Sequence, residues 1–328
     1  MATSSPTYGS ASPASGSRSF FARLRSGDEI ARLITLIFAM TVVLICVLLV
    51  YELWVNSALP RHKFGLKFFV TSDWDPMNDQ FGAFPFIYGT VVTSALALLI
   101  AVPLGIGASI FLAELAPPRI SDTLQFFIDL LAAVPSVIYG LLGFFIVVPL
   151  MRTVIYPALN KPLGFIPLFK GPSYGVGFLT AGIVLAIMVI PYIISVSREV
   201  LLSVPRDQRE AALALGSTRW ESTWKVVVPF ARTGIMGSIF LALARALGET
   251  MAVTMVIGNT PNVSPSLFSS GYSIAAVIAN EFTEATGDLY LQSLIGLGLV
   301  LFLLTFILNG MARLLILFTT QKGSGVSR

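Results

Sequence analysis

Charged residues divide the chain into long uncharged stretches, and the lengths of these stretches predict how the protein is built. A helix needs about 20 mostly apolar residues to cross the hydrocarbon core of a bilayer. Such stretches predict six membrane-spanning helices, at 33–51, 86–113, 130–151, 174–197, 233–257 and 289–312. The fifth stretch differs from the others because it contains two charged residues, Arg245 and Glu249.

The composition agrees with a membrane protein. Hydrophobic residues make up 55% of the chain and charged residues only 12%, whereas about 25% charged residues is usual in soluble proteins. A soluble enzyme, a nucleic-acid-binding protein and a disordered regulator are therefore excluded. The single cysteine, Cys46, and the single histidine, His62, exclude a disulfide framework and the usual zinc or histidine-based sites. We predict an all-α polytopic membrane protein without a metal site.

The positions of Lys and Arg predict the orientation, because loops on the cytoplasmic side of a membrane carry an excess of them. If the N-terminus is inside, the outer loops carry six of the 21 basic residues, which are Arg61, Lys63, Lys67, Arg152, Lys161 and Lys170. The inner segments carry 14, which are Arg18, Arg23, Arg25, Arg32, Arg119, Arg198, Arg206, Arg209, Arg219, Lys225, Arg232, Arg313, Lys322 and Arg328. Both termini are therefore predicted to be cytoplasmic.

These boundaries give the predicted organisation of the chain. Residues 1–28 are expected to be a disordered cytoplasmic tail, because the first 19 of them are rich in Ser, Ala, Gly and Pro. The first transmembrane helix follows at 29–55, an extracytoplasmic loop at 56–85, a five-helix core at 86–318 and a short cytoplasmic tail at 319–328. A cleaved signal peptide is the alternative for the first helix, but its apolar run is longer than the apolar region of a usual signal peptide and starts some thirty residues into the chain.

The segment 198–232 is the one extended hydrophilic stretch on the predicted inner side, and it is patterned as a helical hairpin. Pro205 suits the first turn of a helix, and Gly216 suits its C-terminal end. Thr218 and Glu221 have the spacing of a capping box, which starts a second helix, and Pro229 is expected to close the segment. The hairpin is expected to offer its apolar side chains to a groove on another protein; these are Ala211, Ala212, Leu213 and Leu215.

This hairpin resembles the EAA signature of ABC-importer permeases. Glu210, Ala211 and Ala212 are followed by three residues, Gly216, nine residues and then Val226-x-Val228-Pro229. Valines stand where the family usually has isoleucine and leucine, which preserves the apolar character. The resemblance implies a permease with the architecture of type I importers, in which the hairpin inserts into an ATP-binding subunit and transmits its motion.

The chain has no G-x-x-x-x-G-K-[ST] sequence, so it has no phosphate-cradling loop of its own. We therefore expect that ATP, with Mg²⁺, is used by a partner ATPase, that this chain binds no cofactor, and that it is not an enzyme.

Arg245 is the strongest candidate for contact with a substrate, because it lies near the middle of the predicted fifth span. An arginine there costs roughly 2.5–3.5 kcal/mol on insertion scales and normally faces the protein interior or a transport pathway. If the helix is continuous, Glu249 lies one turn further on the same face. That face is predicted to be the close-packed side, since its other residues are small: Gly234, Ser238, Ala242, Ala246, Gly248 and Ala252.

Two interpretations of this pair remain open. In one, Arg245 and Glu249 only neutralise each other as a structural ion pair, although arginine before glutamate is the weaker order. In the other, Arg245 presents its fork of donors to a tetrahedral oxyanion. Glu249 would then reduce the net charge of the site and accept a hydrogen bond from a protonated oxyanion, which sulfate does not offer.

A second resemblance bears on the substrate. Segments of the chain resemble those of phosphate-specific permeases of the PstC type; these are FGAFPFIYGT at 81–90, VPLG at 102–105, VPSVIYG at 134–140 and RALGETMA at 245–252. The resemblance implies a homologous PstA-type permease as partner, two ATP-binding subunits and an extracytoplasmic phosphate-binding protein. It also implies a location in the bacterial inner membrane and no nucleic-acid partner.

Several alternatives remain. Ser136, beside Pro135, is a weaker pathway candidate, and a local backbone hydrogen bond is the other explanation for it. Pro103, Pro135 and Pro191 all lie inside predicted spans, where a proline kinks a helix or frees a carbonyl group. A sulfate or molybdate permease, a PstA-type subunit and an ion-coupled carrier that needs no ATP are the alternative functions.

Overall fold

The computed structural model describes residues 28–171 and 174–321. Contacts divide the chain into two compact units, Met1–Glu52 and Leu53–Arg328, which we describe separately. Most of the two predicted tails, including Arg18, Arg23, Arg25, Lys322 and Arg328, lies outside the described residues.

The first unit is described from Asp28 and consists of most of helix α2 (Asp28–Val55). The hydroxyl groups of two threonines donate hydrogen bonds to backbone carbonyl groups of the same helix, as an apolar environment requires. Thr35 Oγ1 donates to the carbonyl oxygen of Ala31 at 2.8 Å, and Thr41 Oγ1 donates to that of Ile37 at 2.9 Å. The predicted first helix, 29–55, therefore agrees with α2 within one residue.

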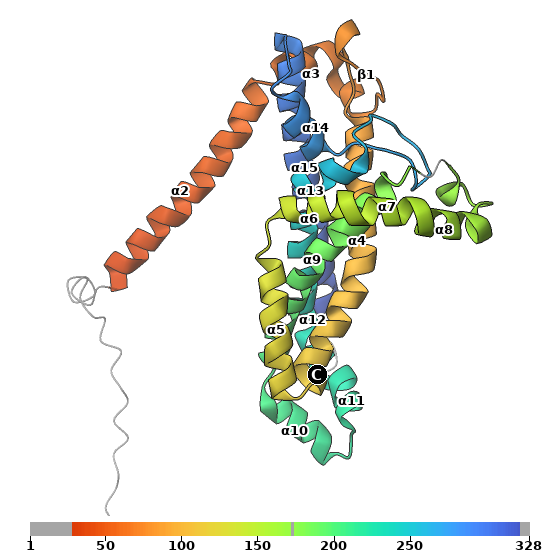
Figure 1. The fold of residues 1–328 in the computed structure, drawn as a ribbon. Helices are drawn as coiled ribbons and strands as arrows, with labels where there is room; N and C mark the ends of the chain where they lie inside the picture. Colours follow the sequence, from red (N-terminus) through yellow and green to blue (C-terminus); the bar gives the residue numbers. More distant parts are fainter. Residues whose placement is uncertain (1–27, 172–173, 322–328) are drawn as a thin grey trace, which may run out of the picture. The chain divides into compact units, whose positions relative to one another are not determined.

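The second unit begins inside α2 and contains all other described elements (Figure 1). They are α3 (Ala58–Phe64), η1 (Gly65–Phe69), β1 (Trp74–Asp75), η2 (Pro76–Asn78), β2 (Gln80–Phe81), α4 (Phe84–Ile110), η3 (Phe111–Leu115), α5 (Pro118–Ala132), α6 (Ser136–Leu142), η4 (Gly143–Val147), α7 (Val148–Leu150), η5 (Met151–Ile155), α8 (Tyr156–Leu163), η6 (Pro167–Phe169), α9 (Phe178–Leu202), α10 (Arg206–Ala214), α11 (Arg219–Ser222), η7 (Thr223–Val227), α12 (Val228–Leu247), α13 (Met251–Ile257), α14 (Ile274–Glu281) and α15 (Asp288–Gln321).

Six helices among the described residues are long and apolar enough to cross a bilayer, as the sequence predicts. They are Ile30–Val55, Phe84–Leu115, Ser136–Pro162, Phe178–Leu202, Arg219–Leu247 and Asp288–Leu314. The third begins six residues later than predicted, because the chain leaves the helical conformation between α5 and α6. Pro135 lies at this break, whereas α4 and α9 continue through Pro103 and Pro191.

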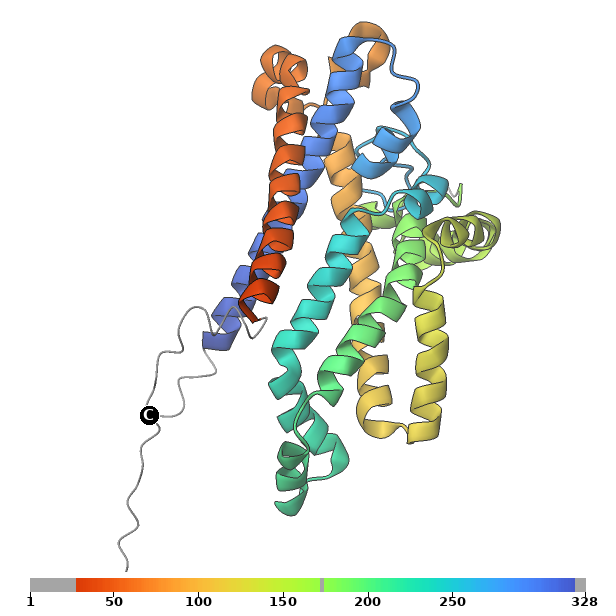
Figure 2. The ribbon, with the colours of Figure 1, turned by 90° about the vertical axis from the view of Figure 1, so that its left-hand side faces the viewer.

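The centre of the second unit is the packing of α4 against α9, which run side by side in both views (Figures 1 and 2). Glycine lets the two backbones approach closely, as is usual between helices in membranes. A Cβ on Gly105 would lie 2.7 Å from Ile193 Cγ2, and a Cβ on Gly182 would lie 2.7 Å from Leu96 Cβ.

Helix α12 packs against both α9 and α4, and it meets α9 through its small residues. A Cβ on Gly234 would lie 2.3 Å from Val200 Cγ1. The hydroxyl oxygens of Ser197 and Ser238, both fully buried, are 2.7 Å apart and hydrogen-bonded. The prediction that the small-residue face of this span is close-packed is therefore confirmed for Gly234 and Ser238.

The helix from α6 to α8 runs across the direction of α4, α9 and α12. Figure 1 shows it lying crosswise, and Figure 2, turned by 90°, shows it almost end-on. It is irregular, because two π-helical turns, η4 and η5, interrupt it, and Pro149 and Pro157 follow these turns. A π-turn accommodates the backbone groups that a proline leaves without a partner.

The segment 56–85, predicted as a loop, is folded into short elements that pack with α14 and the start of α15. Phe81 is fully buried, and Trp74 meets it edge-to-face at 5.0 Å between ring centroids. Glu281 accepts hydrogen bonds from Trp74 Nε1 at 2.9 Å and from the Tyr290 hydroxyl at 2.8 Å. Burial raises the pKa of the nearby Tyr272 to about 12, so its phenol stays protonated at neutral pH.

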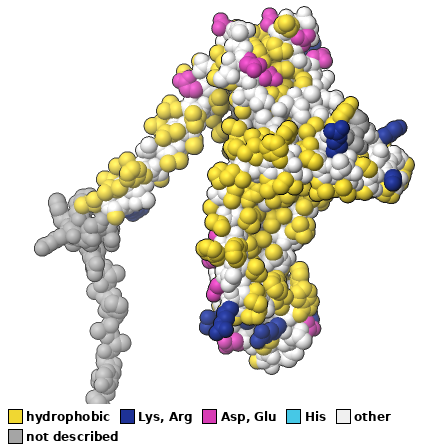
Figure 3. All heavy atoms as spheres, viewed as in Figure 1, with side chains coloured by type: hydrophobic (Ala, Val, Ile, Leu, Met, Phe, Trp, Pro, Cys, Tyr) yellow, Lys and Arg dark blue, Asp and Glu magenta, His cyan; other side chains and the backbone are white. Residues whose placement is uncertain are grey.

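Charges on the surface of the second unit gather at its ends. In Figure 3 hydrophobic side chains cover the middle of this unit, and Lys and Arg side chains mark the end where α10 and α11 lie. Asp and Glu side chains mark the opposite end, and further basic side chains lie around α8. An apolar middle with charged ends is the surface that a bilayer requires.

Candidate functional site

Arg245 lies at the end of a helix, not in the middle of one as predicted. The continuous helix runs from Arg219 to Leu247, and Gly248, Glu249 and Thr250 separate it from α13. The glycine at this point favours helix termination, which the apolar pattern of the sequence does not reveal.

The Arg245 guanidinium group is exposed and lies near an aromatic ring. Its central carbon is 5.7 Å from the centre of the Tyr192 ring, at the outer limit of a cation–π contact. Among the described residues Arg245 has no ion pair and no side-chain hydrogen bond. The prediction that it lies on the close-packed side is wrong, because Ala242 and Ala246 are buried while Arg245 is exposed beside them.

Glu249 is directed to the start of α13. Its Oε1 accepts a hydrogen bond from the backbone N–H of Ala252 at 3.2 Å. A carboxylate at this place satisfies a free N–H group and interacts favourably with the positive end of the helix. The expectation that Arg245 and Glu249 share one helix face is therefore wrong, and the alternative of a structural ion pair between them does not describe this structure.

The break before α6 lies at the same end as the break before α13. A Cβ on Gly140 would lie 3.1 Å from Ala252 Cα, and one on Gly143 would lie 2.9 Å from Val256 Cγ1. The two helices therefore run in the same direction, and Figure 1 shows them together. Ser136 is the first residue of α6 and is partly exposed. The packing thus brings Ser136 to the same end of this helix pair as Glu249.

The predicted hairpin at 198–232 is present and has the predicted caps. Helix α10 starts after Pro205, and Gly216 has a φ of +86°, the left-handed conformation that glycine adopts without strain. The Thr218 hydroxyl accepts from the N–H of Glu221 at 3.2 Å, and Glu221 Oε2 accepts from the N–H of Thr218 at 3.0 Å. This reciprocal pair is the predicted capping box.

Pro229 does not close the hairpin as expected. It lies inside the helix that runs from Arg219 to Leu247, directly after the π-turn η7. The wider turn accommodates the proline, which has no N–H to donate. The hairpin is therefore joined to α12 without interruption.

The exposed surface of the hairpin is apolar but differs in part from the prediction. Glu210, Ala211, Leu213 and Leu215 are exposed, Leu215 by 89%, while Ala212 is only 7% exposed. Ala212 was expected to be offered to a partner and instead faces inward, because it lies on the side of α10 that packs on the rest of the hairpin.

Two tryptophans on this surface were missed by the sequence analysis. Trp220 and Trp224 are exposed and pack edge-to-face, with 5.5 Å between ring centroids. Their i, i+4 spacing at the start of a helix that has a capping box is the signal that would have revealed them.

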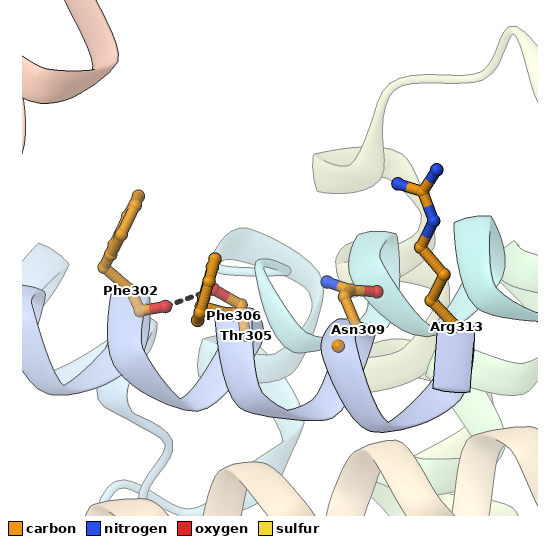
Figure 4. Close-up of a pocket in the computed structure, with 6 residues that line it drawn as sticks. Phe302, Thr305, Phe306, Asn309 and Arg313 are labelled. Carbon is orange, nitrogen blue, oxygen red and sulfur yellow. Dashed lines mark hydrogen bonds between the residues drawn. The ribbon is translucent and has the colours of Figure 1, made fainter. Parts of the chain in front are cut away.

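A separate cavity of about 500 Å³ lies along α15 (Figure 4). It is lined by Phe302, Thr305, Phe306, Asn309, Gly310 and Arg313. None of the predicted site residues contributes to it.

Comparison with known proteins identifies the family. Residues 101–317 match the family described as binding-protein-dependent transport system inner membrane component, which is more than half of the chain. The chain belongs to this family. With its six apolar helices, it is a multi-pass protein of the inner membrane.

The resemblance to PstC-type permeases is confirmed by relatives within this family. The phosphate transport system permease protein PstC of Mesorhizobium japonicum is 48% identical and covers 81% of this chain and 83% of its own length. PstC of Xylella fastidiosa is 49% identical over 79% of this chain and 81% of its own length. These relatives are transport permease subunits.

The fold agrees with that of solved transporters. A bacterial ABC transporter involved in the import of the acidic polysaccharide alginate superimposes with a TM-score of 0.52 and 17% sequence identity. The match covers 89% of this chain and 98% of that chain. The predicted all-α fold of an ABC-importer permease is therefore confirmed.

Proposed function

We propose that this chain is one permease of an ATP-driven importer that carries inorganic phosphate across the bacterial inner membrane. The observation that carries the proposal is the state of Arg245, an exposed guanidinium group at a helix break with no ion pair or side-chain hydrogen bond among the described residues. The names of the relatives support phosphate as the substrate.

The chemistry of Arg245 suits an oxyanion. A guanidinium group is planar, always charged and presents its donors as a fork that matches two oxygens of a phosphate. A charge left without a partner inside a membrane is costly, so such residues face a pathway and find their partner there. Transported phosphate is the partner that satisfies both conditions.

Glu249 and Ser136 complete the proposed site. Phosphate at neutral pH keeps at least one proton, so it donates a hydrogen bond to a carboxylate, whereas fully ionised sulfate has none to donate. Glu249, held at the start of α13 by its bond to Ala252, would accept that bond and reduce the net charge so that phosphate leaves again. Ser136, at the first turn of α6, would add a hydroxyl group.

Energy would come from outside the chain. One of the two ATP-binding subunits, which use ATP and Mg²⁺, would dock on the hairpin through Glu210, Ala211, Leu213, Leu215 and the turn at Gly216, all of which are exposed. Pro229 would not contact the ATP-binding subunit. It lies after the π-turn η7, which joins the hairpin to α12. A PstA-type permease would complete the pathway, and an extracytoplasmic phosphate-binding protein would deliver the substrate.

The excess of Lys and Arg supports cytoplasmic termini. In this orientation α10 and α11 lie on the cytoplasmic side, where ATP is available. A tag at either terminus should then resist protease added to intact spheroplasts and be cleaved after lysis.

The function is tested by co-expressing the chain with a PstA-type permease, the ATP-binding subunit and the receptor, and by measuring [³²P]phosphate uptake in reconstituted vesicles. We expect uptake only with ATP, retained in a tenfold excess of sulfate or molybdate. Uptake without ATP would favour an ion-coupled carrier, and inhibition by sulfate or molybdate would favour a permease for those oxyanions. If two copies of the PstA-type subunit suffice for transport, the proposed role of this chain is wrong.

A further inference from the structure

Arg209 connects the hairpin to the helical bundle through an ion pair. Arg209, on α10, directs Nε to both carboxylate oxygens of Glu114 at 3.2 Å and Nη2 to Glu114 Oε1 at 2.8 Å. The side chain of Arg209 is 20% exposed and that of Glu114 only 10%. A bidentate pair of this kind has a defined geometry as well as strength.

Arg209 also binds the end of α9. Nη2 donates to the carbonyl oxygen of Leu201 at 2.8 Å, and Nη1 donates to that of Val204. A positive charge near the carbonyl end of a helix is favourable. One side chain therefore joins α10 to the ends of two membrane helices, α4 and α9.

The turn that carries Glu114, at the end of α4, is hydrogen-bonded to α5. Glu114 lies in the π-turn η3, and the Leu112 carbonyl oxygen in the same turn accepts a hydrogen bond from Ser121 Oγ at 2.8 Å. Arg198, on α9, donates to the same Ser121 Oγ at 3.1 Å. Helix α5 leads to the break before Ser136, so the connected elements reach the proposed substrate site.

The hairpin is also connected covalently at both ends: α10 follows α9 after three residues, and α11 continues through η7 into α12, the helix that contains Arg245. With these connections alone, a force on the hairpin would reach α9 and α12 through the chain, and α4 only through apolar packing. With Arg209 bound to Glu114 and to α9, the same force moves α4, α9 and α12 together.

We infer that Arg209, paired with Glu114, is a positioning residue that transmits the motion of the docked ATPase to the membrane helices. This inference rests on the proposed function, because it requires an ATPase on the hairpin. Docking itself belongs to the exposed residues of the hairpin, and Arg209 points away from that surface. Loss of the pair should therefore uncouple ATP hydrolysis from transport without releasing the ATPase.

The test uses the complete co-expressed importer in vesicles and measures bound ATPase, ATP hydrolysis and phosphate uptake for each variant. In Arg209→Gln and in Glu114→Gln, we expect at least a tenfold loss of phosphate moved per ATP hydrolysed. The amount of co-purified ATPase should stay within twofold of the unaltered complex. The double variant should lose no more than the worse single variant, because both substitutions remove one interaction.

Lys225→Gln is the matched control, since it removes a basic charge and an ion pair with Glu221 from the exposed side of the same hairpin. We expect it to keep phosphate transport per ATP within twofold. Arg209→Lys, which keeps the charge but loses the fork, should give an intermediate loss and shows that the hairpin still folds.

Three results would overturn the inference: an unchanged transport ratio in Arg209→Gln, additive losses in the double variant, or release of the ATPase by either single variant. Failure of the proposed function is distinguishable, because the unaltered chain would then retain no ATPase and show no ATP-dependent uptake.

Discussion

Two arginines of this permease lie in contrasting environments. Arg209 is largely buried, and its three nitrogens donate to Glu114, to the Leu201 carbonyl group at the end of α9 and to the Val204 carbonyl group just beyond it. Arg245 is exposed, and its central carbon lies 5.7 Å from the centre of the Tyr192 ring. All three nitrogens of the first arginine have acceptors within the protein, whereas the second has no ion pair and no side-chain hydrogen bond among the described residues.

The difference separates a structural charge from a ligand-binding one. A buried charge must have its partners within the protein, because burial without them is expensive. An arginine with no protein partner in a membrane span requires another partner, which is a second chain, water or a ligand. Substitution of the two arginines should therefore affect different quantities: transport per ATP for Arg209, and substrate binding for Arg245.

The largest expected effect is on phosphate uptake in Arg245→Ala. Loss of two charge-assisted hydrogen bonds, at roughly 1.5 kcal/mol each, lowers the transport rate by about 100-fold. The complex should assemble with normal amounts of ATPase, as measured by co-purification from detergent. Arg119→Ala, which removes an exposed arginine at the start of α5, is the control and should transport normally. Normal uptake in Arg245→Ala would remove this residue from the substrate pathway.

A smaller effect is expected from a substitution that pushes helices α6 and α13 apart. In Gly140→Val the new side chain meets Met255 Sδ and Ala252 Cα, for which the Cβ distances are 2.6 and 3.1 Å. Overpacking of this kind costs about 1–3 kcal/mol, and we expect a lower melting temperature together with reduced uptake. Gly107→Val, at a helical position with no heavy atom within 4 Å of the added Cβ, should leave both nearly unchanged. Equal behaviour of the two variants would contradict the close α6–α13 contact.

Two substitutions of Glu249 separate the effect of its negative charge from its effect as a helix cap. Glu249→Gln keeps an oxygen that accepts from Ala252, so thermal stability should be retained while uptake falls several-fold. Glu249→Ala loses the cap as well and should cost about 1 kcal/mol in the free energy of unfolding. Thermal unfolding in detergent, followed alongside uptake, distinguishes the two variants. If Glu249→Gln transports normally, the carboxylate serves only as a cap.

The smallest effect is expected at the turn of the hairpin. Gly216→Ala places a Cβ at a φ of +86°, which costs about 1 kcal/mol, although no atom lies within 4 Å of it. We expect a slightly lower melting temperature and a reduction in uptake of less than threefold. A larger loss of uptake with normal stability would show that an ATPase contacts this turn closely.

The fold was largely predictable because its signals are local. The uncharged stretches indicate six spans, and Pro205, Gly216, Thr218 and Glu221 mark the hairpin at the positions that the structure confirms. These residues act on their own backbone neighbours, so their positions in the sequence suffice to interpret them.

The geometry of the site was less predictable because it depends on helix breaks inside apolar segments. The segments on either side of Gly248 and of Pro135 are mostly apolar, so the sequence suggests one continuous helix where the structure has two. The pairing of Arg209 with Glu114 was missed for a different reason: 95 residues separate the two, and only the packing of α10 under α4 brings them together.

The central claim is that Arg245 faces the transported anion, and cysteine accessibility tests it most directly. In a Cys46→Ser background, Ser136→Cys provides a single thiol for a water-soluble, positively charged methanethiosulfonate reagent and leaves Arg245 in place. We predict that the thiol is modified in the assembled importer, that millimolar phosphate slows the modification at least fivefold, that sulfate slows it less, and that Arg245→Ala abolishes the protection by phosphate. A thiol that stays unmodified, or one whose modification rate does not respond to phosphate, would contradict the account.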